Sequence, residues 1–129
     1  MDGVFDLFHV GHLEAIQKCK SFGHHVCIGV ISDEDCRSYK RNPIIPGDHR
    51  AEIVKNIKDV DEVIYPAPLV LTLDFINKHS IDKVVHAFKD NDDFKKQYIF
   101  FKELIDAGKF IRIDYCDKVS TTDIIRKIK

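Results

Sequence analysis

The sequence has little of what marks membrane, secreted or nucleic-acid-binding proteins. No apolar run approaches the ~18 residues that a membrane-spanning helix needs, and the opening MDGVFDLF lacks the basic start and long apolar stretch of a signal peptide. The net charge of −1 leaves no basic excess, so a general nucleic-acid surface is disfavoured. The four cysteines form no C-x-x-C pair, and we interpret them as reduced thiols of a cytoplasmic protein.

Strand-like and helix-like segments alternate along the chain, which predicts one α/β domain over residues 1–129. Apolar runs typical of buried strands lie at 25–32, 61–65, 82–88 and 110–115. Helical spacing or capping residues predict helices over 9–22, 32–40, 49–59, 71–80, 93–108 and 120–129, with loops at 42–48 and 89–93. This order predicts a Rossmann-like, doubly wound parallel sheet with helices on both faces, which binds ligands at the carboxyl ends of its strands.

Two histidines stand at the predicted start of the first helix. Their spacing puts His9 and His12 on one face of the first turn, and Gly11 between them lets a ligand approach the backbone. Free amides and the helix dipole at such a start attract anions, and imidazoles add donors for phosphate oxygens. A pair of surface or capping histidines fits the same pattern. A zinc site has no H-E-x-x-H or cysteine pair to support it, so we assign no metal-ligating residues.

The wider stretch DGVFDLFHVGH resembles the signature of the H-x-G-H nucleotidyltransferases, in particular the cytidylyltransferases that activate phosphocholine, phosphoethanolamine or glycerol 3-phosphate. Three more stretches match that family, namely SDEDCRSYKRNPI, DHRAEIVKNIKDVDEVI and VSTTDIIRKI. The resemblance covers essentially the whole chain. It implies that a phosphoalcohol takes CMP from CTP, supplied as its Mg²⁺ complex, to give pyrophosphate and a CDP-alcohol for phospholipid synthesis. It also implies a homodimer, with residues 58–61 as a candidate contact.

The resemblance further implies which residues hold the nucleotide. His9, His12 and Lys40 are expected to act on the phosphates during the transfer. The expected nucleotide-binding residues are Gly3, Val4, Phe5, Asp6, Gly11, Arg50, Ser120, Thr121 and Thr122. The hydroxyls of 120–122 would hold the β- and γ-phosphates from the start of the last helix, and Asp6 would orient the site.

Several of these residues also have a plainer interpretation. Lys40 could be an ordinary solvated lysine, Asp6 a turn carboxylate, and Ser120 the cap of a helix. Arg50 lies in the first turn of a predicted helix, where a cation is unfavourable beside the helix dipole. We therefore expect Arg50 to have an anionic partner.

The sequence departs from the family at particular positions. Only Met1 precedes Asp2, so the strand that leads into the first motif is expected to be truncated or missing. Tyr115 and Lys118 stand where relatives have arginine and glycine, which removes one phosphate-facing cation and makes Lys118 its candidate replacement. Leu69 stands where choline-using relatives have an aromatic residue, the type of side chain that suits a quaternary ammonium group.

The acceptor pocket is expected near the strand that ends at residue 88, lined by Leu69, His86 and Asp90. His86 either points into this pocket or is an ordinary strand-end histidine. Asp90, with Asp92 and Asp93, either faces an ammonium group or lies in a solvated loop. Because the aromatic wall is missing, we favour phosphoethanolamine over phosphocholine, with glycerol 3-phosphate third. An adenylyltransferase and a nucleotide-binding module without turnover are the alternatives.

Overall fold

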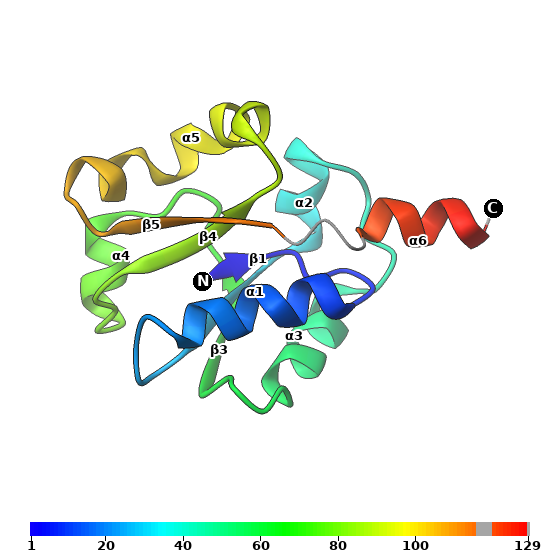
Figure 1. The fold of residues 1–129 in the computed structure, drawn as a ribbon, viewed down its shortest axis with the longest axis horizontal. Helices are drawn as coiled ribbons and strands as arrows, with labels where there is room; N and C mark the ends of the chain where they lie inside the picture. Colours follow the sequence, from blue (N-terminus) through cyan, green and yellow to red (C-terminus); the bar gives the residue numbers. More distant parts are fainter. Residues whose placement is uncertain (116–119, 129) are drawn as a thin grey trace.

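The computed structural model describes residues 1–115 and 120–128 and has the predicted alternation of strands and helices (Figure 1). The elements are β1 (Asp2–Gly3), α1 (Val10–Lys20), β2 (Cys27–Ile31), α2 (Asp33–Tyr39), α3 (Gly47–Lys55), β3 (Glu62–Ala67), α4 (Leu73–Lys78), β4 (Val84–Phe88), α5 (Asn91–Asp106), β5 (Phe110–Asp114) and α6 (Thr121–Ile128). Short parallel strands joined by helices are what the apolar runs and the helix-capping residues predict.

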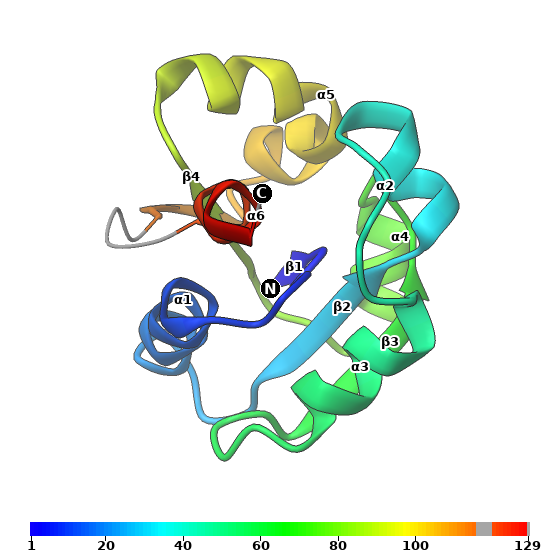
Figure 2. The same cartoon turned by 90° about the vertical axis from the view of Figure 1, so that its right-hand side faces the viewer.

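The strands form two parallel groups that lie next to each other. β1 pairs with β2 and β2 with β3, whereas β4 pairs with β5. β1 lies against β4 without pairing with it, so the order across the molecule is β3, β2, β1, β4, β5 (Figure 2). The direction of winding reverses between β1 and β4, and such a switch point is where open α/β sheets bind their ligands. The doubly wound parallel arrangement is thus confirmed.

The first strand is present in a short form of two residues, which excludes only the alternative that it is missing altogether. Its residues pair in parallel with Gly29 and Val30 of β2. Met1 extends this pairing, because its amino group donates to Cys27 O (3.1 Å) and its carbonyl accepts from Gly29 N (2.8 Å). The strand therefore satisfies its backbone groups on the β2 side, and it has no ladder with β4.

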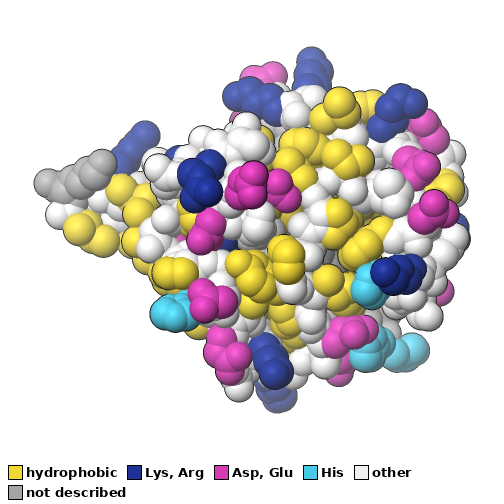
Figure 3. All heavy atoms as spheres, turned by 180° about the vertical axis from the view of Figure 1, so that it is seen from behind, with side chains coloured by type: hydrophobic (Ala, Val, Ile, Leu, Met, Phe, Trp, Pro, Cys, Tyr) yellow, Lys and Arg dark blue, Asp and Glu magenta, His cyan; other side chains and the backbone are white. Residues whose placement is uncertain are grey.

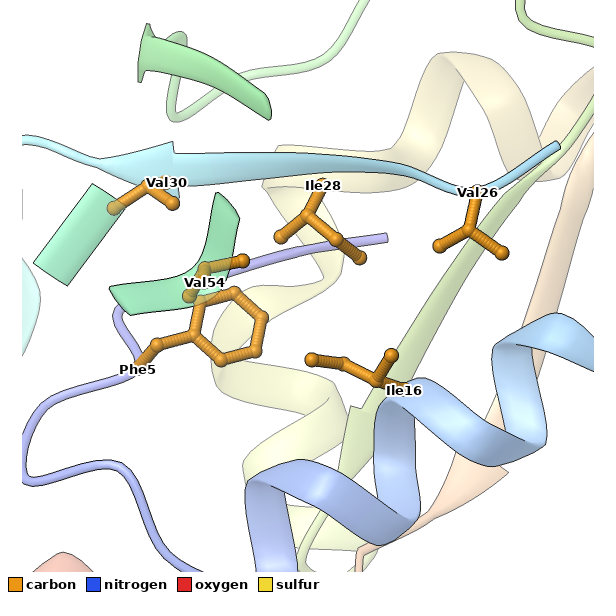
Figure 4. Packing of buried hydrophobic residues seen from close by; sticks show 6 residues of the cluster. All are labelled: Phe5, Ile16, Val26, Ile28, Val30 and Val54. Atoms are coloured by element: carbon orange, nitrogen blue, oxygen red, sulfur yellow. The ribbon is translucent and has the colours of Figure 1, made fainter. Parts of the chain in front are cut away.

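Helices cover both faces of this arrangement, and each face has its own hydrophobic cluster. The cluster under α1 and α3 consists of Phe5, Ile16, Val26, Ile28, Val30 and Val54 (Figure 4). The cluster under α4 and α5 consists of Leu71, Ile76, Val84, Phe88, Phe101 and Leu104. Each large apolar side chain that leaves water contributes roughly 1.5–3 kcal/mol. The two clusters therefore hold the two strand groups in place although β1 and β4 share no ladder.

Some element boundaries differ from the sequence-based expectation. α5 begins at Asn91, inside the segment 89–93 that we expected to be a loop, and the carboxylate of its N-cap residue Asp90 accepts a hydrogen bond from Asp93 N (2.8 Å). α3 begins at Gly47, inside the segment that we expected to be a loop, and α1 ends at Lys20, before Gly23. In each case the boundary lies a few residues earlier than the glycine or the run of polar residues indicated.

The surface shows one projecting element. α6 extends away from the body, and hydrophobic side chains gather along it and on the adjoining face (Figures 1 and 3). Its residue Ile128 is 77% exposed. Cys19, Cys27 and Cys36 are free thiols, and Cys116 lies outside the described residues. Across residues 1–115 and 120–128, no helix is long and apolar enough to cross a membrane.

Candidate active site

A cavity of about 730 Å³ opens at the carboxyl ends of β1 and β4, at the switch point of the sheet. The predicted site residues that line it are Gly3, Val4, Phe5, Asp6, His12, Lys40, His86, Asp90, Ser120, Thr121 and Thr122. They come from the turn after β1, the end of α2, the end of β4 and the start of α6. Parallel strands end at one edge of the sheet, which explains how segments so far apart in the sequence reach one cavity.

The turn between β1 and α1 has an unusual backbone that places Asp6. Phe5 and Leu7 adopt left-handed conformations (φ 55° and 48°), which are uncommon for residues other than glycine. The Phe5 ring is buried in the core, and its packing offsets the local cost. Asp6 is 2% exposed, and its carboxylate accepts hydrogen bonds from Ile44 N (2.7 Å) and Ile45 N (2.9 Å). Asp6 thereby fixes the segment that follows α2 at the rim of the cavity.

The Asp6 carboxylate also pairs with Arg41, whose Nη1 lies 3.0 Å from Asp6 Oδ2. Burial by itself raises the pKa of Asp6, but the two backbone hydrogen bonds and the Arg41 guanidinium outweigh it and hold this pKa below its usual value. Asp6 is therefore ionised at neutral pH. Arg41 lines the cavity and was missed by the sequence analysis. Its position directly after Lys40 was the only sequence signal for it.

His9 and His12 cap α1 with their own imidazole rings. His9 is the N-cap residue, and its Nδ1 accepts from Gly11 N (3.0 Å), while His12 Nδ1 accepts from His9 N (3.2 Å). A neutral imidazole carries its proton on one nitrogen, so in both rings the proton lies on Nε2, which becomes a donor. The rings stack with their centroids 3.9 Å apart. The capping and the functional interpretations are thus compatible, because capping selects the donor nitrogen.

Both imidazoles are neutral at physiological pH. Burial lowers the pKa of His9, and burial together with the charges of His9 and Lys40 lowers the pKa of His12 to about 3. His12 is 8% exposed and lines the cavity, whereas His9 stacks against it, is partly exposed and is not one of the lining residues. The arrangement therefore offers N–H donors that are uncharged at physiological pH.

The start of α6 meets the histidines across the turn after β1. Thr121 Oγ1 donates to the carbonyl oxygen of Asp6 (2.9 Å) and lies 3.4 Å from His9 Nε2. Ser120 caps α6, since its hydroxyl accepts from Asp123 N (3.1 Å), as its plainer interpretation predicted. Hydroxyls, imidazoles and the amino end of a helix therefore converge on one part of the cavity, the combination that binds phosphate groups.

Lys40 supplies a cation close to these donors. It is the C-cap residue of α2, and its ammonium nitrogen lies 5.6 Å from the centroid of the Tyr39 ring. Lys40 keeps part of its surface in solvent, yet the protein atoms crowded around its ammonium group lower its pKa, chiefly by burial. Lys118, the other expected cation, lies outside the described residues.

The opposite end of the cavity is built around a pair of side chains. His86 Nδ1 lies 2.7 Å from Asp2 Oδ1, and both residues are largely buried. This contact joins β1 to β4, which share no backbone hydrogen bonds in the sheet. Asp2 was not among the predicted site residues, and nothing local to Asp2 in the sequence indicates a partner 84 positions away.

The carboxylates at the start of α5 serve the helix as well as the cavity. Asp90 caps α5, and Asp93 accepts from Lys89 N (2.9 Å) and Gln97 Nε2 (2.8 Å). Lys89, Lys96 and Gln97 also line the cavity, and the sequence analysis had not selected them. The 3.6-residue period that brings Asp93 and Gln97 onto one helix face is the signal that could have found the glutamine.

Arg50 does not line the cavity, although the sequence analysis expected it among the nucleotide-binding residues. Its side chain is completely buried and donates to the carbonyl oxygens of Val4 (2.7 Å), Ile31 (2.9 Å) and Ile45 (2.9 Å), and to the Asp33 carboxylate. The expected anionic partner is therefore a side chain of this protein. Arg50 holds the ends of β1 and β2 and the segment before α3 together.

Two other predicted residues also lie outside the cavity lining. Leu69 packs against the small cluster that includes Ile31 and Cys36, so it does not form a wall of the acceptor pocket. The Gly11 N–H, expected to be free for a ligand, donates to His9 instead. Gly11 therefore supports the orientation of the histidine and does not itself line the cavity.

Comparison with known protein families agrees with this geometry. The sequence model described as Cytidylyltransferase-like matches residues 1–127. The chain belongs to the cytidylyltransferase-like family. This is the family whose signature the stretch DGVFDLFHVGH resembles.

The similar curated proteins carry phosphoalcohol cytidylyltransferase names. The chain is 35% identical to an ethanolamine-phosphate cytidylyltransferase of Arabidopsis thaliana, over 99% of this chain and 31% of that protein. It is 38% identical to choline-phosphate cytidylyltransferase 2 of the same plant, over 98% of this chain and 43% of that protein. A choline-phosphate cytidylyltransferase of Saccharomyces cerevisiae is 36% identical over 98% of this chain and 30% of its own length. The chain spans less than half the length of these relatives.

A solved structure supports the fold. The lipopolysaccharide core biosynthesis protein from Thermoplasma volcanium GSS1 superposes with a TM-score of 0.71, covering 90% of this chain and 94% of that one. The sequence identity is 22%, so the likeness is one of architecture. It confirms the α/β arrangement of parallel strands flanked by helices.

Proposed function

We propose that this domain transfers the CMP group of CTP to the phosphate of a small phosphoalcohol and releases pyrophosphate. The observation that carries the proposal is the convergence of Thr121 from α6 with His9 from α1 around the backbone of Asp6. We call His9, His12, Lys40 and the hydroxyls of 120–122 the phosphate end of the cavity. We call His86 and the start of α5 the acceptor end. The two ends face one cavity, as a transfer between two bound substrates requires.

The transfer needs no covalent intermediate with the protein. An oxygen of the acceptor phosphate attacks the α-phosphorus of CTP in line, and the bond from that phosphorus to the oxygen bridging to the β-phosphate breaks. The bonding electron pair leaves with pyrophosphate. Negative charge spreads over the phosphoryl oxygens during this step, and donors that are already in position stabilise it. The neutral Nε2–H groups of His9 and His12 and the Lys40 ammonium are the donors proposed for this role.

Mg²⁺ enters our proposal as part of the nucleotide substrate. It is a hard cation that binds triphosphates and keeps several of its waters, so the protein need not supply a cage for it. Over residues 1–115 and 120–128 the structure has no group of three or more His, Cys, Asp or Glu side chains placed to hold a metal ion. We therefore assign Mg²⁺ to CTP rather than to a protein site.

Phosphoethanolamine is the acceptor that we propose first, ahead of phosphocholine and glycerol 3-phosphate. The acceptor end presents carboxylates of Asp90, Asp92 and Asp93, which can accept hydrogen bonds from a primary ammonium group. A trimethylammonium group has no N–H to donate and depends on aromatic faces. Among the described lining residues, the only Phe, Tyr or Trp rings are those of Phe5 and Tyr115, which belong to the phosphate end.

Pyrophosphate release measures the proposed reaction directly. Purified protein with Mg²⁺ is supplied with CTP or ATP and, in turn, with each of the three phosphoalcohols. We expect release with CTP and phosphoethanolamine, slower release with phosphocholine, and little with ATP. Turnover confined to glycerol 3-phosphate would overturn the acceptor assignment, and turnover with ATP alone would make the domain an adenylyltransferase. Nucleotide binding without release for any acceptor would favour the non-catalytic module.

Assembly and location are further parts of the proposal. We propose a homodimer that uses residues 58–61, a segment that connects α3 to β3 and is partly exposed in the single chain. Light scattering on the purified protein measures this, and a monomer at micromolar concentration would contradict it. A cytoplasmic location is proposed from the free thiols of Cys19, Cys27 and Cys36.

A further inference from the structure

Arg41 lies at the phosphate end of the cavity, and its ion pair with Asp6 uses only part of its guanidinium group. Its Nη1 donates to Asp6 Oδ2 (3.0 Å) and to Asn42 O (3.2 Å). Within residues 1–115 and 120–128, its Nε and Nη2 groups donate to nothing. The side chain is 38% exposed and lines the cavity. One edge of the guanidinium is therefore anchored to the protein while the other keeps donors for a ligand.

Asp6 does not need Arg41 in order to hold the segment after α2. Its two carboxylate oxygens already accept from Ile44 N (2.7 Å) and Ile45 N (2.9 Å). Asp6 is nearly buried, whereas the guanidinium reaches the cavity. Asp6 thus acts as the fixed support that orients Arg41, which reduces the side-chain freedom that Arg41 would lose on binding a ligand.

The position of Arg41 indicates which part of the nucleotide it meets. The carboxylate of Asp6 holds Arg41, and the backbone carbonyl of the same residue accepts from Thr121 Oγ1 (2.9 Å). In Figure 2 the segment between α2 and α3 and the helix α6 stand on either side of the turn that follows β1. Arg41 and the hydroxyls of 120–122 therefore approach the same stretch of the cavity, around Asp6.

We infer that Arg41 binds the β- and γ-phosphates of CTP and stabilises them as pyrophosphate departs, an inference that rests on the proposed function. A guanidinium presents parallel N–H donors that match two phosphate oxygens, and it stays charged at any physiological pH. Lys40, the neighbouring cation, is a point charge close to His12 and thus to the α-phosphate. Together the two basic residues place positive charge on both sides of the bond that breaks.

The experiment compares the binding of CTP, CMP and pyrophosphate to the wild type and to variants by calorimetry in the presence of Mg²⁺. Arg41→Ala is expected to raise the Kd for CTP and for pyrophosphate by about tenfold or more, because charge-assisted hydrogen bonds are lost. The Kd for CMP, which lacks both outer phosphates, is expected to stay within about twofold. Arg41→Lys, which keeps the charge without the fork, should fall between the wild type and Arg41→Ala.

Arg37→Ala is the matched control. Arg37 lies on α2, is exposed and does not line the cavity, so its removal should leave all three dissociation constants unchanged. A merely structural Arg41 would weaken CMP and CTP binding equally and lower the melting temperature, which would overturn the inference. Unchanged CTP binding in Arg41→Ala would also overturn it while leaving the proposed function intact. A wild-type protein that binds no CTP would overturn both.

Discussion

The two ends of the cavity are held in different ways. At the phosphate end, backbone N–H groups donate to His9, His12 and Asp6, so each functional side chain is fixed by the chain around it. At the acceptor end, backbone N–H groups also donate to Asp90 and Asp93, but His86 is held by one carboxylate, that of Asp2, across strands that do not pair. Support by several backbone groups is redundant, whereas a single side-chain pair is easily altered. In our proposal, the chemistry common to many nucleotidyl transfers therefore lies on the rigid side, and the part of acceptor recognition that depends on His86 lies on the adaptable side.

The largest expected effect is a loss of stability on removing Arg50, the residue that connects the phosphate end of the cavity to the core. Arg50→Ala removes the donors that satisfy Val4 O and Ile31 O and leaves a void in a fully buried place. We expect the free energy of unfolding to fall by about 3–5 kcal/mol in urea titrations. Arg37→Ala, at an exposed position on α2, should change it by less than about 0.5 kcal/mol. Equal stability of the two variants would contradict the structural role of Arg50.

The next effect concerns the donors themselves. His12→Ala removes an Nε2–H group from the cavity and the acceptor of the His9 N–H. Loss of one such preorganised donor typically lowers the rate by about 10²–10³-fold, and we expect kcat/KM for CTP to fall by that amount. His49→Ala, at an exposed position on α3, should keep full activity. A His12 variant that folds normally and retains wild-type turnover would exclude His12 from the reaction.

A third prediction uses the pKa of His12, which burial lowers from its usual 6.5 to about 3. Below pH 6.5 the unfolded chain takes up a proton at this residue and the folded protein does not, so stability falls as the pH falls. Between about pH 6.5 and about pH 5 this costs up to about 2 kcal/mol. His12→Asn should remove that part of the pH dependence in urea titrations, whereas His49→Asn should keep it. An unchanged slope in His12→Asn would show that His12 titrates normally.

The smallest effect is expected at the acceptor end. His86→Ala breaks the contact with Asp2 and is expected to raise KM for phosphoethanolamine by about tenfold, the value of one buried hydrogen bond to a charged group. KM for CTP should stay within about twofold, because the phosphate end has its own supports. His24→Ala, at an exposed position between α1 and β2, serves as the control. An equal rise in both KM values would mean that the two ends are not independent.

The sequence predicted the features that depend on the residue pattern of a single segment. The alternation of strands and helices followed from apolar runs and capping residues, and the histidines, Thr121 and Lys40 followed from their motifs. The sequence left open whether the first strand is short or missing, and its residues, with the amino group and carbonyl of Met1, do pair with β2. Asp90 as a helix cap was overlooked because a run of polar residues looks like a loop until its hydrogen bonds are known.

Long-range partners explain the remaining errors. The rule that a cation is unfavourable in a first helical turn did indicate that Arg50 has an anionic partner. The anionic partner is Asp33. The carbonyl groups that accept from Arg50 come from the residue after β1, from β2 and from the segment before α3, and the sequence alone does not show that these segments meet. Arg41 was missed for the same reason, since Asp6, which turns it toward the cavity, lies 35 positions earlier in the chain.

The hydrogen bond from Thr121 to the carbonyl of Asp6 spans 115 positions of the sequence. During synthesis on the ribosome the imidazoles therefore emerge long before the hydroxyls that complete their surroundings. A nascent chain that ends before residue 120 lacks the hydroxyls of 120–122 and therefore has only part of the proposed phosphate end. The proposed transfer therefore requires that translation has passed α6 and that the two distant segments have met.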